Sequence, residues 1–155
     1  MKGREQDPQG KFPKQGKLLQ RLSDALKSGV YRAPHGRDIA DALRGSRLRL
    51  ARIDLAGVTA KDALLARIAA TLDFPPWFGG NWDALEDCLA DLSWSKFDGH
   101  VLLFESTQGL PLDERGILAD ILASAASSWK ERGRPFFAVF VGGEATLPEL
   151  YRARG

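Results

Sequence analysis

Hydrophobic residues recur along this chain with a helical period in several places. Leu64, Leu65, Ile68 and Leu72, for example, are spaced so that they fall on one face of a helix. A shorter helical pattern precedes them between Asp38 and Arg44. The full set of helices predicted in this way covers residues 17–28, 38–44, 59–72, 82–91 and 113–131.

Three apolar runs, at 48–55, 101–104 and 136–141, predict β-strands because each is short and ends at turn or charged residues. The second run is continuously apolar, which is typical of a strand buried on both faces of a sheet. Val30 and Tyr31 are candidates for one further extended piece. Because helices separate the three strands, we expect them to run parallel. The pattern predicts an α/β domain around a three-stranded parallel sheet, preceded by a partly helical N-terminal extension.

Residues at the predicted helix ends support these boundaries. Asn81 is a favoured N-cap for the helix that starts at residue 82, and Thr59 followed by Asp62 resembles a capping box. The helix over 113–131 opens with two acids and closes beside two bases, which matches the helix dipole at both ends.

The composition fits a single globular chain of 155 residues, 44% hydrophobic and 27% charged, and argues against disordered and collagen-like classes. Cys88 is the single cysteine, so an internal disulfide is excluded. No apolar run approaches the ~18 residues of a membrane span, and the first residues lack the apolar core of a secretory signal. We therefore expect a cytoplasmic protein.

Charge divides the chain into two parts. Residues 1–47 carry a formal charge of +6 and residues 48–155 one of −4, for a net +2. This asymmetry predicts a basic extension over 1–47 and a separate domain over 48–155. Residues 1–16, rich in Gly, Pro, Gln and Lys, are expected to form a disordered arm.

Residues 68–95 contain no basic residue, and most of their acids fall on the predicted helix 82–91. Like charges four residues apart cost an isolated helix about 0.2–0.5 kcal/mol per pair, and no neighbouring base offsets them. Such a ridge is either a solvated face or a surface that attracts a positively charged partner. The acids on this helix are Asp83, Glu86, Asp87 and Asp91.

Two large aromatics and two glycines, Trp77-Phe78-Gly79-Gly80, stand directly before the acidic helix. Aromatic side chains are enriched at the centres of protein interfaces, which favours a binding surface here. The alternative is that one or both aromatics belong to the core.

Residues 74–94, FPPWFGGNWDALEDCLADLSW, resemble the barstar family of intracellular ribonuclease inhibitors. The shared pattern is aromatic-aromatic-Gly-x-Asn-x-Asp-Ala-Leu-x-Asp, followed by Cys-Leu and a downstream Trp. The order of predicted elements between 48 and 141 also fits that family, whereas residues 1–47 have no counterpart in it.

The resemblance implies a barstar-like fold and a non-enzymatic inhibitor that occludes the active site of a basic, barnase-like ribonuclease. Asp87 would occupy the pocket of a substrate phosphate, and Asp83 would pair with an arginine of the nuclease, since Arg binds carboxylates as it binds phosphates. The partner-binding residues implied are Trp77, Gly79, Gly80, Asn81, Trp82, Asp83, Ala84, Glu86, Asp87 and Asp91.

Three positions depart from the pattern of the family's prototype. Glu86 stands where the prototype has tryptophan on the binding helix, and Trp82 stands where it has leucine. Ser128 falls at the position of a glutamate that contacts the nuclease, so we expect that contact to be absent.

Other chemistry has little support in the sequence. His35, His100 and Cys88 form no ligand-spaced cluster, so neither a metal nor a cofactor is expected. Asp83 and Asp87 lie on a predicted solvent-exposed face. Acid–base catalysis by a carboxylate pair requires an apolar environment that raises the pKa of one of them, and none is predicted there. Cys88 is expected to face the core as a small hydrophobe. The chain is therefore expected not to be an enzyme.

The basic extension supports a rival hypothesis, a nucleic-acid-associated or regulatory module. Its Lys and Arg side chains could contact phosphates, although Phe12 is the only aromatic among them. The inhibitor hypothesis instead expects no nucleic acid, no membrane and a monomer when free. The basic residues concerned are Lys2, Arg4, Lys11, Lys14, Lys17, Arg21 and Lys27.

Overall fold

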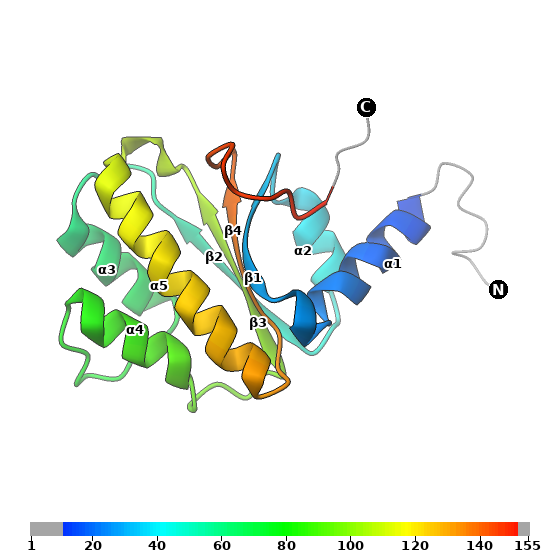
Figure 1. Cartoon of the computed structure of the whole chain (residues 1–155), viewed down its shortest axis with the longest axis horizontal. Helices are drawn as coiled ribbons and strands as arrows, with labels where there is room; N and C mark the ends of the chain where they lie inside the picture. Colours follow the sequence, from blue (N-terminus) through cyan, green and yellow to red (C-terminus); the bar gives the residue numbers. More distant parts are fainter. Residues whose placement is uncertain (1–10, 152–155) are drawn as a thin grey trace.

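A four-stranded parallel sheet with strand order β1-β4-β3-β2 forms the centre of the molecule (Figure 1). The structure is a computed structural model that describes residues 11–151, with side chains from residue 16. Its strands are β1 (Gly29–Ala33), β2 (Leu48–Asp54), β3 (Gly99–Glu105) and β4 (Phe136–Val141).

The prediction of three strands was wrong, because β1 adds a fourth from within residues 1–47. β1 pairs in parallel with β4, from Gly29 opposite Phe137 to Ala33 opposite Val141. Its other edge is covered by the chain after β4: the Arg32 amide donates to the Pro148 carbonyl at 2.8 Å. Its residues form no continuous apolar run, because Arg32 interrupts them, so its place in the sheet depends on long-range pairing.

Helices cover both faces of the sheet (Figure 1). On one face lie α3 (Lys61–Thr71), α4 (Trp82–Asp91) and α5 (Leu112–Glu131), and on the other lie α1 (Lys11–Leu22) and α2 (Arg37–Leu43). Two short 3-10 turns, η2 (Ala25–Lys27) and η3 (Thr107–Gly109), complete the elements.

The sheet separates two hydrophobic cores, and successive residues of its central strands alternate between them. Leu102 and Phe104 of β3 pack toward α3, α4 and α5, whereas Val101 and Leu103 pack toward α1 and α2. All four are fully buried, which confirms that this apolar run is a strand covered on both faces.

Residues before 47 supply half of the buried side chains of the second core. Leu18 and Leu22 of α1 and Ile39 and Leu43 of α2 are buried in it together with side chains of β3 and β4. Helix α1 begins at Lys11, inside the stretch 1–16 predicted to be a disordered arm, and residues 1–10 of that stretch lie outside the described residues. The division of the chain at residue 47 remains a prediction.

Candidate functional site

The loop between α3 and α4 is shaped by proline, glycine and asparagine. The Phe78 amide donates to the Pro75 carbonyl at 3.0 Å, which closes a turn. Gly80 follows with a φ of 71°, a conformation that favours glycine. Asn81 then caps α4, because its side-chain oxygen accepts from the Ala84 amide at 2.8 Å. The local sequence therefore sets where the acidic helix begins.

The two aromatics of this loop have different environments. Phe78 packs edge-on against Phe74, 5.0 Å between ring centroids, and Phe74 contacts Trp94 in the same way. Phe78 is thus partly buried and packs against the edge of the core. Trp77 instead exposes 65% of its surface to solvent. The loop also borders a groove of about 300 Å³, lined by Asp62, Leu65, Ala66, Ala69, Phe78 and Gly80.

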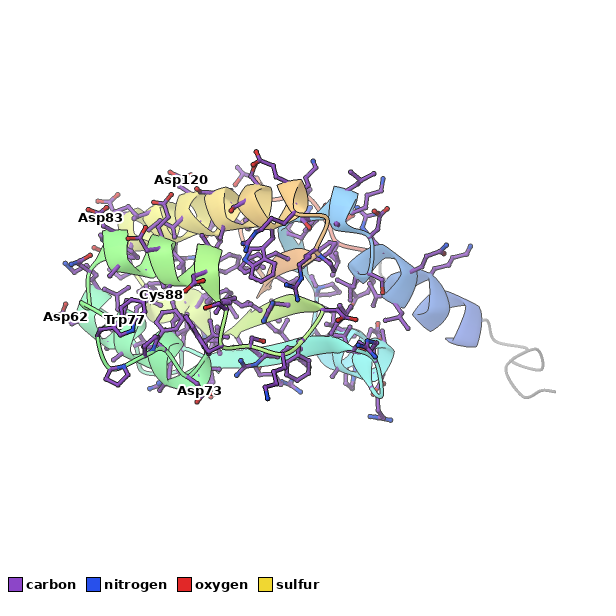
Figure 2. All side chains as sticks on the ribbon, turned by 90° about the horizontal axis from the view of Figure 1, so that it is seen from below. Asp62, Asp73, Trp77, Asp83, Cys88 and Asp120 are labelled. Atoms are coloured by element: carbon purple, nitrogen blue, oxygen red, sulfur yellow. The ribbon has the colours of Figure 1, made fainter. Side chains whose placement is uncertain are left out.

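Helix α4 divides cleanly into a buried face and an acidic face. Leu85, Cys88 and Leu89 are fully buried, whereas Asp83 and Asp87 are exposed. Figure 2 shows Asp83 and Trp77 at the same end of the molecule and Cys88 further along the helix. Among the residues that the structure describes, neither Asp83 nor Asp87 makes an ion pair.

The Cys88 thiol is held in its neutral form. Burial raises its pKa, and the negative charges of Asp87 and Asp91 raise it further. A thiol with a raised pKa is a weak nucleophile, so Cys88 packs as a small hydrophobe, as the helical pattern predicted.

The remaining candidate residues occupy intermediate positions around this face. Trp82 and Ala84 are half-buried, and Trp82 packs against the core, while Asp91 is exposed at the far end of the helix. Glu86 is half-buried and accepts a hydrogen bond from the Ser124 hydroxyl of α5 at 2.8 Å. The sequence places Glu86 on the acidic helix but gives no sign of its contact with Ser124, because the two residues are 38 positions apart.

The last turn of α4 is also held by α5, through contacts that no local pattern in the sequence indicates. The buried indole of Trp129 donates to the Leu89 carbonyl at 2.8 Å, and the Arg132 guanidinium donates to the Ala90 carbonyl. Trp129 is one of the buried residues of α5, and helical spacing does not indicate which group its indole reaches. The hydrogen bond from its indole to α4 depends on how the two helices pack together.

A cavity of about 180 Å³ lies elsewhere, between α5 and the chain after β4. Its walls are mainly apolar, and its arginine, Arg115, is already paired with Glu144 at 2.7 Å. Within the described residues, no three His, Cys, Asp or Glu side chains come together as a metal site would require. No helix of the described chain is long and apolar enough to cross a membrane.

Comparison with known proteins identifies one matching family. The family model for Barstar (barnase inhibitor) matches residues 48–141, which include the acidic helix, its preceding loop and strands β2 to β4. That family is one of inhibitors rather than enzymes. No curated protein matches the chain.

Among solved structures, the fold is similar to the ORC2 protein of Aeropyrum pernix, solved as ADPNP–ADP complexes. The similarity has a TM-score of 0.51 at 14% identity, and it covers 84% of this chain but 40% of that one. At this identity the likeness concerns the arrangement of helices and strands alone.

Proposed function

Because the chain belongs to the barstar (barnase inhibitor) family, we propose that it binds a basic ribonuclease of the barnase type and occludes its active site. The observation that carries this proposal is the pair of exposed carboxylates, Asp83 and Asp87, that no basic side chain of the described chain neutralises. A ribonuclease must present Arg and Lys to the phosphates of RNA, and those side chains also bind carboxylates.

Asp87 is the proposed mimic of a substrate phosphate, and Asp83 the proposed partner of an arginine. The proposed contact surface adds the loop and the rest of the acidic helix: Trp77, Gly79, Gly80, Asn81, Trp82, Ala84, Glu86 and Asp91. Its exposed tryptophan beside unpaired carboxylates combines a large apolar contact with charge, as at the centres of tight interfaces.

The proposal includes the state and place of the protein. The inhibitor acts as a monomer in the cytoplasm of the producing cell, without a catalytic activity of its own. Residues 48–155 carry the inhibitory surface, since every proposed contact falls within them. Ser128, on α5, supplies no carboxylate to the interface, which distinguishes this chain from the family's prototype.

Inhibition of RNA cleavage by barnase, combined with binding kinetics, tests the proposal. Asp87→Ala is expected to accelerate dissociation at least about tenfold, because it leaves cations of the nuclease buried without a partner. The matched control is Asp41→Ala, which removes the same charge from α2 on the opposite face of the sheet and breaks only an exposed pair with Arg44.

Association of the wild-type chain should also slow as salt rises. Barnase and its inhibitor are themselves the reference case for such electrostatic steering. The proposal is wrong if Asp87→Ala dissociates as slowly as the Asp41→Ala control, or if association is indifferent to salt.

A further inference from the structure

The acidic helix α4 carries four carboxylates and no basic residue, yet its negative C-terminal end must be stabilised. Its last carbonyls have no partner within the helix unless something caps them. The Leu92 amide donates to the Cys88 carbonyl, but the carbonyls of Leu89 and Ala90 accept no hydrogen bond from a backbone amide in the described chain. Their donors come instead from the end of α5.

Two side chains at the end of α5 form this cap, and a third, Arg134, holds the segment that follows α4. The Trp129 indole reaches the Leu89 carbonyl, and the Arg132 guanidinium reaches the Ala90 carbonyl while lying 4.2 Å from the centre of the Trp129 ring. Arg134 lies over the same ring at 5.1 Å and donates to the carbonyls of Phe97 and Asp98, in the segment that leads from α4 to β3.

We propose that Trp129, Arg132 and Arg134 form a clamp that positions α4 for inhibition. The clamp places positive charge at the end of the helix where a cation is favourable, and leaves Asp83 and Asp87 unpaired. Stacking of the guanidinium groups on one buried ring fixes their direction. Because Arg132 and Arg134 bind backbone carbonyls rather than carboxylates, α4 is held without loss of the charge that the partner binds.

The clamp rests on the proposed function and extends it with positioning residues outside the contact surface. It makes a prediction opposite in sign to simple electrostatics. Arg132→Leu makes the inhibitor more negative, so charge alone predicts tighter binding to a basic nuclease. If Arg132 positions α4, the same variant binds more weakly, because the carboxylates are no longer held in the direction that the nuclease requires.

Binding kinetics with barnase and hydrogen exchange of the free protein test the clamp together. Arg132→Leu should accelerate dissociation about tenfold without slowing association, and should raise amide exchange at the end of α4 about tenfold. Arg132→Lys keeps the charge and the ability to donate a hydrogen bond but loses the planar stack on Trp129. Its dissociation rate and amide exchange should therefore lie between those of the wild type and Arg132→Leu. The control Arg44→Leu removes the same charge from the C-cap of α2, and should leave dissociation and exchange near α4 unchanged.

Three results separate the clamp from the proposed function. A wild-type chain that fails to inhibit barnase counts against the proposed function, whereas the exchange measurement still decides whether α5 holds α4. Unchanged exchange at the end of α4 in Arg132→Leu overturns the clamp even if inhibition is strong. Equal or slower dissociation of Arg132→Leu from barnase overturns its role in inhibition.

Discussion

Replacing Trp129 by phenylalanine tests how much the fold depends on the bond between α5 and α4. The side chain is 1% exposed and its indole nitrogen donates to the Leu89 carbonyl at 2.8 Å. Phenylalanine keeps an aromatic ring but has no donor, so the carbonyl would be left buried and unpaired. Such a loss costs about 1–3 kcal/mol, and the smaller ring adds a cavity cost of about 1 kcal/mol.

The expected total is a loss of about 2–4 kcal/mol in the free energy of unfolding, a large share of the roughly 5–15 kcal/mol typical of a domain. For a chain of this length it corresponds to a fall of roughly 5–15 °C in melting temperature. Urea unfolding followed by far-ultraviolet circular dichroism measures the free energy directly, provided that the slope against urea is unchanged.

Two other tryptophans supply matched controls for the same Trp→Phe substitution. Trp94 donates to the Leu72 carbonyl at 3.1 Å in a partly buried position, and the Trp82 indole makes no hydrogen bond in the described chain. We therefore expect destabilisation to decrease from Trp129→Phe through Trp94→Phe to Trp82→Phe. If Trp129→Phe is no more destabilised than Trp82→Phe, the buried bond contributes nothing and the reasoning is refuted.

Three further predictions concern pH, backbone space and the exposed loop. Burial first, and then the charges of Arg49 and Arg134, lower the pKa of His100 from 6.5 to about 4, so the unfolded chain binds the proton first as pH falls. The free energy of unfolding should fall by up to about 3 kcal/mol between pH 6.5 and 4. The urea midpoint of His100→Gln should fall less over this range than that of the wild type, and an equal fall in both proteins would contradict the prediction. Gly99→Ala should destabilise, because its Cβ would lie 2.7 Å from the Pro135 carbonyl oxygen, whereas Gly116→Ala in α5 meets open space and should stabilise by about 0.5–1 kcal/mol in thermal unfolding; the opposite order would contradict this. Trp77→Ala should leave the melting temperature unchanged and weaken binding to barnase, and a large loss of stability would show that Trp77 is part of the core.

The local geometry of α4 and its preceding loop was largely predictable from sequence because its determinants are local, whereas the binding role of these residues remains a prediction. Asn81 caps α4 through a bond three residues away, and helical spacing alone separates the buried Leu85 and Cys88 from the exposed Asp83 and Asp87. The limits of α4 and β4 agree with the predicted ranges 82–91 and 136–141. The predicted capping box at Thr59 is wrong, because α3 begins at Lys61 with Ala60 as its N-cap and no side-chain hydrogen bond at the cap.

What the tertiary structure decided involves residues distant along the chain. β1 belongs to the sheet because β4 and the segment after it supply its hydrogen bonds, more than 100 positions away. Ser124, Trp129 and Arg132 meet α4 only because both helices pack on the same face of the sheet. Periodicity and capping report on neighbours within a few residues, whereas which carbonyl a distant arginine reaches depends on how whole elements are packed.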